Sequence, residues 1–383
     1  MKLAFVVSLW FPYGGMQRSL LRIARACVAR GHQVDIYTGE WQGERPEKIG
    51  VFELDTKAGT NHRSNDLLAQ RFAAAVSGKD YDCRVGFTKL PGLDVYYAAD
   101  PCYAARVAET KPTIYRWLPR YCAFRRQEEA VFQPGTGTEV MLIAHQERER
   151  FIRFYGTESE RFHLLPPGIN RERLTAEAGL EGDREALRTE LGMRPGESMI
   201  LVVGSRFRTK GVDRVIRALA ALPPEVQESS RLVIVGHGRA KPFQRLAAGL
   251  GVGKRVVFTG TREDVPRFYR AADFLVHAPR SENTGTVLIE AMICGLPVLV
   301  TGNCGFAFHV TDAQAGRVVA EPFEQSRLDA ALADFLVSPE RSGWTQNGPA
   351  YCDRTDLYSL IERAADVIIA RAERNRRTDA ASA

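Results

Sequence analysis

The chain begins with a short apolar segment, a glycine turn, a helical pattern and a second apolar segment. Residues 3–8 are apolar and rich in valine, which is typical of a strand buried on both faces of a sheet. Apolar side chains then recur at helical spacing through 16–30 until Gly31 ends the helix, and 34–38 form the next strand. This order predicts a βαβ unit, in which the two strands lie parallel in one sheet.

A second series of the same kind begins near the middle of the chain. A strand at 199–203 ends at Gly204 and is followed by a helix at 212–222. The other expected elements are strands at 83–87, 95–98, 140–144, 232–235, 256–259, 274–277 and 297–301, and helices at 265–271 and 286–294. Strands that alternate with helices in two series predict an α/β fold of two Rossmann-like domains, each with a parallel sheet.

The boundary between the two domains is expected at the Pro-Pro-Gly sequence of residues 166–168. Two prolines followed by glycine resist both helix and sheet. We therefore assign 1–167 to the first domain and 168–355 to the second. The last helix, 356–371, carries an apolar stripe and is expected to pack back on the first domain, while the basic tail beyond it is expected to fray.

Charge, cysteine content and apolar runs exclude several classes of protein. The chain has 52 Lys and Arg against 46 Asp and Glu, and its formal net charge of +6 favours anionic partners. Its seven cysteines are scattered and form no C-x-x-C pair, which suits reduced thiols in a cytoplasmic protein better than disulfides or a zinc site. No apolar run approaches the roughly 20 residues that cross a bilayer. Because no small-residue cleavage site follows the apolar N-terminus, we expect a buried strand there rather than a signal peptide.

Two carboxylates stand eight residues apart after the strand at 274–277. Glu282 lies in the loop and Glu290 in the second turn of the next helix. The residues near the start of this interval are Asn283, Thr284, Gly285 and Thr286. Both glutamates therefore face the carboxyl edge of the sheet, where open α/β folds bind ligands, and carboxylates accept hydrogen bonds from sugar or ribose hydroxyls. Spacing alone favours a solvated surface glutamate and a helix-face glutamate, but the turn residues between them indicate a site.

A cationic loop follows the strand at 199–203. It carries Arg206, Arg208 and Lys210 just before a helix N-terminus. Guanidinium and ammonium groups in this position bind phosphates, and the helix dipole assists them. The alternative is three solvated cations, but their place at the carboxyl end of a strand favours phosphate binding.

Gly14 and Gly15, between the first strand and the first helix, would let backbone N–H groups approach a ligand closely. A plain βα turn is the alternative. The chain contains neither a complete G-x-G-x-x-G nor a Walker A lysine motif, so the sequence gives little support for NAD, FAD or ordinary kinase sites. No pair of histidines has the spacing of metal ligands, and we read the histidines as structural.

Cations and aromatic residues alternate through 103–132. The residues that we single out for membrane contact are Arg116, Trp117, Arg120, Tyr121, Arg125 and Arg126. Such a mixture suits an interface with anionic lipid, and it also suits single-stranded nucleic acid. An ordinary helical hairpin with a basic outer face is a third interpretation. Nucleic acid is the weakest of these, because the basic residues converge on one loop and one hairpin rather than lining a groove.

Together these features resemble the retaining glycosyltransferases of the GT-B fold, family 4, and more narrowly the lipopolysaccharide core glucosyltransferase I group. The resemblance covers nearly the whole chain. Its finer strings are FPYGGMQR at 11–18, TNH at 60–62, GFTKLPGLDVY at 86–96, LLPPGI at 164–169 and CG at 304–305. It implies two parallel sheets that face a central cleft, and an enzyme that adds the first outer-core hexose to the heptose region of lipid A–core at the cytoplasmic face of the inner membrane.

The resemblance also implies roles for the donor-binding residues. Arg206, Arg208 and Lys210 would hold the UDP diphosphate, and Arg173 could reach it. Glu290 would bind the ribose hydroxyls. The residues that would contact the sugar or the phosphates besides these are Glu282, Asn283, Thr284, Gly285, Thr286, Gly14 and Gly15.

Catalysis is expected to depend on charge rather than on a metal or cofactor, with the UDP-sugar as substrate. Fixed cations would stabilise the departing diphosphate, and nearby carboxylates the positive sugar ring. Glu282 would hold O3 and O4 of the sugar, and Asp100 falls where the group has an acidic residue close to the transferred sugar. Because family members retain the anomeric configuration, the acceptor would attack from the face that UDP leaves, and we assign no covalent nucleophile.

Two departures from the family pattern leave the donor open. Ser19 stands where the group often carries Asp, and Ser205 where many family members carry Arg. At Ser19 a donor or acceptor contact would differ, and in place of an arginine at 205 the work would fall to Arg206 or Arg208. Asn283 and Thr284 could contact the C2 or C4 substituent of the sugar, and a hydrogen-bonding site can reject an analogue strongly. The hexose could therefore be glucose, galactose or an N-acetylated hexose. The remaining alternatives are a family 4 transferase with another lipid or polysaccharide acceptor, a UDP-N-acetylglucosamine 2-epimerase, and a non-catalytic protein that binds a membrane surface.

Overall fold

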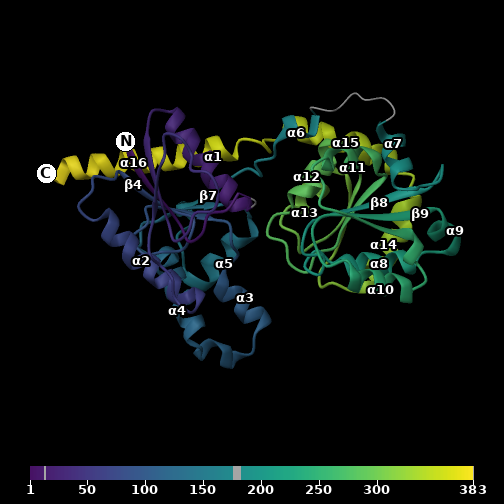
Figure 1. The fold of residues 1–383 in the computed structure, drawn as a ribbon, viewed down its shortest axis with the longest axis horizontal. Helices are drawn as coiled ribbons and strands as arrows, with labels where there is room; N and C mark the ends of the chain where they lie inside the picture. Colours follow the sequence, from purple (N-terminus) through teal and green to yellow (C-terminus); the bar gives the residue numbers. More distant parts are fainter. Residues whose placement is uncertain (13, 176–182, 383) are drawn as a thin grey trace. The chain divides into compact units, whose positions relative to one another are not determined.

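Two parallel sheets organise the chain, one in each of two units (Figure 1). The computed structural model describes residues 1–12, 14–175 and 183–382, so Tyr13 of the glycine-turn string lies outside the described residues. The first unit comprises Met1–Gly168 with Ser359–Ala383, and the second comprises Ile169–Tyr358. The predicted α/β fold of two Rossmann-like domains is confirmed, whereas the predicted roles of the domains stay predictions.

The first unit has a seven-stranded sheet in the order β3-β2-β1-β4-β5-β6-β7, in which all pairs are parallel. Its strands are β1 (Lys2–Val7), β2 (Gln33–Thr38), β3 (Gly50–Glu53), β4 (Cys83–Gly86), β5 (Val95–Ala98), β6 (Glu139–Leu142) and β7 (Phe162–Leu164). Its helices are α1 (Gly15–Ala29), α2 (Asn61–Val76), α3 (Tyr103–Thr110), η1 (Thr113–Trp117), α4 (Pro119–Phe132), α5 (Gln146–Tyr155), η2 (Ser159–Arg161) and α16 (Leu360–Ser382). The strand order reverses between β1 and β4, and this switch point is where open α/β sheets bind ligands.

Strand β1 shows why this sequence forms a doubly covered sheet. Leu3, Phe5 and Val7 face the core that contains side chains of α1 and α16, and Ala4 and Val6 face the core that contains side chains of α2, α4 and α5. All five are fully or almost fully buried. A strand covered on both faces has no solvent-facing positions, which explains the unbroken apolar run.

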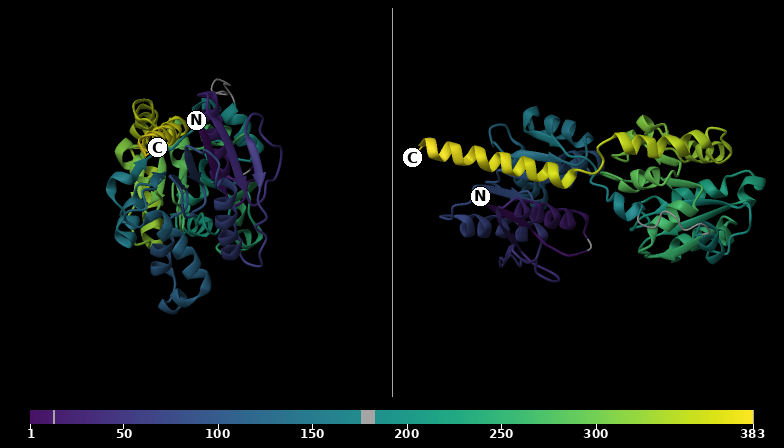
Figure 2. Two further views of the ribbon diagram at one scale, coloured as in Figure 1. Left: turned by 90° about the vertical axis from the view of Figure 1, so that its left-hand side faces the viewer. Right: turned by 90° about the horizontal axis from the view of Figure 1, so that it is seen from above.

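The last helix is longer than predicted. It runs over Leu360–Ser382 and lies along the first unit as the yellow helix of Figures 1 and 2. The expectation that residues beyond 371 fray is wrong, because the basic tail meets acidic side chains at the amino ends of neighbouring strands. Arg374 pairs with Glu139, and Asn375 Nδ2 donates to Asp94 Oδ1 at 3.0 Å.

The second unit has a six-stranded parallel sheet in the order β10-β9-β8-β11-β12-β13. Its strands are β8 (Ser198–Val203), β9 (Ser230–Val235), β10 (Val256–Gly260), β11 (Phe274–His277), β12 (Val298–Thr301) and β13 (Gly316–Val319). Its helices are α6 (Arg171–Thr175), α7 (Asp183–Glu190), α8 (Val212–Ala220), α9 (Pro224–Glu228), α10 (Lys241–Gly249), η3 (Gly253–Arg255), α11 (Val265–Ala271), α12 (Thr286–Ile293), α13 (Ala307–Ala313), α14 (Gln325–Val337) and α15 (Arg341–Arg354). The order reverses between β8 and β11, so the loops after these two strands lie side by side at the switch point.

None of the described helices combines the length and the apolar content that a membrane span requires.

Candidate functional site

The loops after β8 and β11 bring opposite charges together at the switch point of the second sheet. Lys210 Nζ forms an ion pair with Glu282 Oε2, although 72 residues separate them in sequence. The backbone N–H of Arg280 donates to Thr209 O at 2.8 Å, which ties the two loops to each other. The sequence-predicted phosphate-binding lysine and sugar-binding glutamate therefore share one site.

A buried histidine lies beneath this ion pair. His277 ends β11 with no exposed surface, and its Nε2 lies 3.5 Å from Glu282 Oε2. Burial opposes ionisation of Glu282, but His277 and Lys210 outweigh it and lower the pKa of Glu282 to about 2. Burial also lowers the pKa of His277 against the opposing effect of Glu282, so the imidazole is neutral at pH 7. The sequence predicts a structural role for His277, because a single histidine in an apolar strand carries no further signal.

Glycines shape both loops. Gly204 has φ +150°, and a Cβ there would lie 3.1 Å from Lys210 Cγ, so the lysine stem passes closely over the turn. Gly285 has φ +95°, and a Cβ there would lie 2.3 Å from Cys304 Sγ. Glycine is required at this second position, where the chain turns into α12 from the loop that carries Glu282.

The loop that carries Glu282 is held from the next strand along the sheet. The N–H of Gly305 donates to Glu282 O at 3.2 Å, and the N–H of Phe306 donates to Thr284 O at 2.7 Å. Cys304 Sγ also lies 3.3 Å from Thr284 O. These contacts fix the backbone of Glu282 and Thr284, which flank the half-buried Asn283 in sequence.

Glu290 lies in the second turn of α12. Tyr269 OH donates to its Oε2 at 2.7 Å. Burial and the charge of Glu290 raise the pKa of the Tyr269 hydroxyl, and the nearby Arg173 opposes this rise only weakly. Arg173 itself donates to Glu263 O at 3.2 Å. Glu290, Tyr269 and Arg173 thus form a second polar group in the same unit.

The two arginines of the cationic loop point to solvent. Arg206 and Arg208 are exposed, and among the described residues neither guanidinium forms an ion pair. Arg206 adopts φ +59°, unusual for a residue other than glycine, and its N–H donates to His237 O at 3.0 Å. Ser205 Oγ accepts a 3.4 Å hydrogen bond from the His237 N–H, so Ser205 helps to hold this loop against the next one.

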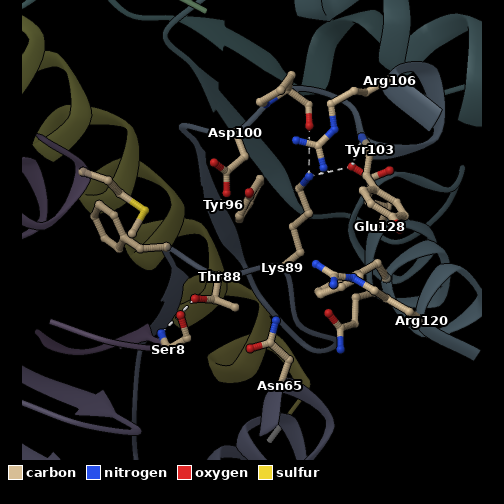
Figure 3. Close-up of a pocket in the computed structure, with 15 residues that line it drawn as sticks. Ser8, Asn65, Thr88, Lys89, Tyr96, Asp100, Tyr103, Arg106, Arg120 and Glu128 are labelled. Carbon is tan, nitrogen blue, oxygen red and sulfur yellow. Dashed lines mark hydrogen bonds and ion pairs between the residues drawn. The ribbon is translucent and has the colours of Figure 1, made fainter. Parts of the chain in front are cut away.

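A pocket of about 260 Å³ lies at the switch point of the first sheet (Figure 3). Asp100, which follows β5, lines it together with Lys89 from the loop after β4 and Ser8 from the loop after β1.

Gly14 is the residue before α1, and a Cβ there would lie 1.9 Å from Gln17 Oε1. Gly15 begins the helix with no atom near its missing Cβ.

A buried carboxylate organises one wall of this pocket. Glu128 on α4 accepts hydrogen bonds from Lys89 Nζ at 2.5 Å, from Tyr155 OH at 2.6 Å and from the N–H of Tyr103 at 2.8 Å. Burial disfavours both charges, but their pairing raises the pKa of Lys89 and lowers that of Glu128, so both stay ionised. The sequence analysis missed this pair, which joins residues 39 positions apart.

The residues predicted to contact a membrane divide into two sets. Arg116 and Trp117 in η1 and Arg120 on α4 are exposed, Trp117 by 83%. Tyr121 is buried, Arg125 is paired with Glu129, and Arg126 with Asp66. We call Ile114, Arg116, Trp117 and Leu118 the hairpin tip. It lies between α3 and α4, where the chain projects from the lower edge of the first unit in Figure 1.

No cluster of three or more His, Cys, Asp or Glu side chains that could hold a metal ion occurs in the described part of the chain. Asp100 and Glu282 lie in different units, so their predicted catalytic roles stay predictions.

Comparison with known proteins points to sugar transfer. The sequence profile of the glycosyl transferases group 1 matches residues 183–350. The lipopolysaccharide glucosyltransferase WaaG of Escherichia coli (strain K12) is 42% identical over 369 residues, which are 96% of this chain and 98% of that protein. The crystal structure of WaaG, described as a glycosyltransferase involved in lipopolysaccharide biosynthesis, matches with a TM-score of 0.85 over 96% of this chain and 99% of that one. Anabaena HepE in complex with UDP and glucose is 19% identical with a TM-score of 0.72 over 97% and 100%, which shows a shared fold alone.

Proposed function

We propose a function from one premise: the chain belongs to the glycosyltransferase family that includes the lipopolysaccharide glucosyltransferase WaaG. It is a hexosyltransferase of the GT-B fold that acts in the synthesis of the lipopolysaccharide core. The finer proposal is that it moves a hexose, glucose first, from a UDP-sugar to the heptose region of the inner core. The transfer retains the anomeric configuration and uses no metal ion.

The convergence of Lys210 and Glu282 is the observation that carries this proposal. Without ligand the two side chains neutralise each other. A UDP-sugar offers each of them a better partner, because its diphosphate is anionic and its pyranose carries hydroxyls. Lys210 would pair with the diphosphate, and Glu282 would accept hydrogen bonds from O3 and O4 of the sugar.

The reaction breaks the bond between the anomeric carbon and the diphosphate oxygen, and the bonding electrons leave with UDP. Lys210, with Arg206 and Arg208, stabilises the negative charge that develops on the leaving group. The acceptor hydroxyl forms the new bond on the face that UDP leaves, and its proton passes to the departing phosphate. Glu282 stabilises the positive charge on the ring, and Asp100 is the proposed catalytic or orienting carboxylate from the first unit.

The remaining donor contacts are proposed by position. Glu290, fixed by Tyr269, would bind the ribose hydroxyls, and Arg173 would approach the diphosphate. Gly14 and Gly15 would bring backbone donors to the phosphates. Asn283 and Thr284 are polar groups that could contact the sugar at C2 or C4, and they keep UDP-galactose and UDP-N-acetylhexosamines among the donors to be tested.

A panel of UDP-sugars offered with truncated lipopolysaccharide tests the function. Mass spectrometry of the product identifies the added residue, and the anomeric proton coupling gives its configuration. We expect one added hexose with retained configuration and unchanged turnover in excess EDTA. Turnover of the donor in the absence of acceptor, with formation of an epimer, would show an epimerase instead. The non-catalytic alternative is not favoured, because the chain belongs to a family of transferases.

The hairpin tip is proposed to bind the cytoplasmic face of the inner membrane, where the lipid-linked acceptor lies. Ile114 is 74% exposed, Trp117 83% and Leu118 46%, which is unusual for three large apolar side chains so close in sequence. Arg116 stands among them and would meet anionic headgroups.

Removing two groups from the tip should weaken membrane binding. We expect Arg116→Gln/Trp117→Ser to lower binding to anionic vesicles in flotation assays by about a hundredfold, because a buried indole contributes roughly 2 kcal/mol and each surface cation about 1 kcal/mol. The matched control is Arg148→Gln/Leu164→Ser, which removes an exposed arginine and an exposed leucine elsewhere on the same unit. Equal flotation of the tip variant, the control variant and the wild type at low salt would rule the tip out.

A further inference from the structure

The pocket in the first unit contains two guanidinium groups that the donor site does not use. Arg106 on α3 and Arg120 on α4 both line it, and Figure 3 shows both groups directed into it. Among the residues that the structure describes, neither is paired with a carboxylate. We propose that this pocket is the acceptor site and that it selects a sugar bearing a phosphate or carboxylate. This inference rests on the proposed transfer reaction and adds the acceptor's chemical class.

A pair of aromatic rings holds the two arginines in place. The guanidinium of Arg106 lies 5.5 Å from the ring centre of Tyr103, and that of Arg120 lies 5.6 Å from the ring centre of Phe124. The two rings are themselves 5.3 Å apart, so they join α3 to α4. Cation–π contact fixes the stem and plane of each arginine while leaving its N–H donors available. Each guanidinium held in this way suits the oxygens of a phosphate or carboxylate.

The charges of the pocket leave these arginines uncompensated. Lys89 is the third cation, but Glu128 holds it at 2.5 Å and the pair is neutral. Asp100 is then the remaining carboxylate in the lining, against two guanidinium groups. The excess positive charge favours an anionic ligand over a neutral one.

Other residues of the lining fit a sugar ring. Met16, Phe87 and Tyr96 supply apolar surface, and Asp100 supplies an acceptor for hydroxyl groups. The volume of about 260 Å³ is below the range that holds drug-sized ligands, which suits a single sugar residue with its substituent. The headgroup of a membrane lipid also carries a phosphate. The experiment must therefore distinguish binding of an acceptor sugar from binding of a lipid headgroup.

Kinetics with two forms of one acceptor test the inference. Truncated lipopolysaccharide, de-acylated to make it soluble, is used with its phosphates intact and after their removal with aqueous hydrofluoric acid, its carboxylates kept or reduced. Arg106→Gln/Arg120→Gln is expected to raise the acceptor KM for the intact form by about tenfold for each lost arginine. The KM for the form stripped of its anionic groups should change less than twofold, and the KM for the UDP-sugar should not change.

The control is Arg148→Gln/Arg153→Gln on α5. Both arginines are exposed, and Arg153 lies over the ring of Phe154 without a carboxylate partner among the described residues, so it matches the pocket arginines in setting. This control should keep the wild-type KM for both acceptors. Circular dichroism and Tm values show that each variant folds. An equal KM increase for intact and stripped acceptor would overturn the inference.

Two further measurements distinguish failure of the proposed acceptor site from failure of the proposed function. Loss confined to vesicle binding, with normal kinetics on the soluble acceptor, would assign the arginines to lipid headgroups and overturn the acceptor site. If the wild type transfers no hexose to any acceptor, the proposed function fails, and direct binding then decides the pocket. NMR titration with mannose 6-phosphate and with mannose should show tighter binding of the phosphate, and the double variant should lose that preference. Equal binding of the two probes by the wild type would overturn the inference on its own.

Discussion

Replacing Lys210 with methionine is expected to lower kcat about 10³-fold without unfolding the protein. The ammonium group is the half-buried cation of the loop after β8, and in the proposed reaction it meets the charge that develops on the diphosphate. Loss of one preorganised partner for such a charge costs roughly 10²–10³ in rate, and a full positive charge lies at the upper end. Methionine keeps the stem that packs over Gly204. Initial rates at saturating donor and acceptor measure the effect.

The matched control for this variant is Lys254→Met. Lys254 is exposed on the same unit, and no ion pair of its side chain occurs among the described residues. It should keep wild-type kcat and wild-type affinity for UDP. A loss of less than tenfold in Lys210→Met, with UDP affinity unchanged, would remove Lys210 from the phosphate site.

The same variant should change stability in acid in a defined direction. The pKa of Glu282 is lowered from 4.5 to about 2, so the ion pair stabilises the fold fully above pH 4.5 and loses this effect as the pH falls towards 2. Without Lys210 the pKa of Glu282 rises, although the hydrogen bond with His277 continues to lower it. We therefore expect the Tm difference between wild type and variant to be constant from pH 7 to about 5 and to shrink below pH 4.5.

The central strands and the edge strands of the sheets differ in how well the sequence predicts them. Leu3–Val7 could be predicted because both faces of a central strand are buried and every position is apolar. β3, β7 and β13 were not predicted. All three lie at sheet edges and keep half or more of their side chains partly exposed, which weakens the apolar signal. β10 is also an edge strand and partly exposed, but its sequence VVFT is apolar enough for the strand to be predicted.

In the candidate site, residues that are close in sequence could be predicted to act together, whereas residues that only packing brings together could not. Glu282 and Glu290 stand on one loop and the helix after it, so their order after β11 could be predicted from the sequence pattern. The pair of Lys89 and Glu128 could not, because Glu128 lies within a helix rich in arginine and glutamate, where a charged residue usually faces solvent. Only the packing of α4 against the loop after β4 shows that this carboxylate is buried.

Replacing Glu282 with glutamine is expected to lower kcat/KM for the UDP-sugar about 10²-fold while leaving the affinity for UDP equal or higher. Glutamine keeps the shape but replaces two charge-assisted hydrogen bonds to sugar hydroxyls with neutral ones, each weaker by roughly 1 kcal/mol, and it no longer opposes the positive charge on the ring. UDP has no pyranose, so its binding does not need the hydrogen bonds of Glu282. In the variant Lys210 also no longer has to break an ion pair with a carboxylate before it binds the diphosphate of UDP. Calorimetry with UDP and kinetics with the UDP-sugar separate these effects.

Glu225→Gln is the control, since Glu225 is exposed in the same unit and should tolerate the change. Glu282→Gln and Lys210→Met are expected to act in opposite directions on UDP binding, although both lower turnover. Reduced UDP affinity in both variants would mean that the ion pair only holds the two loops in position and that neither side chain contacts the ligand.

The double variant Lys210→Met/Glu282→Gln distinguishes a ligand-binding pair from a structural one. If each side chain contacts a different part of the donor, the loss in kcat/KM of the double variant should approach the product of the losses of the two single variants. It should fall somewhat short of that product, because the double variant has no ion pair to break before the donor binds. If the pair matters only for the shape of the loops, the second substitution should add nothing to the first, because either one already breaks the contact. A double variant as active as Lys210→Met would therefore remove Glu282 from the sugar site, whatever the single variants show.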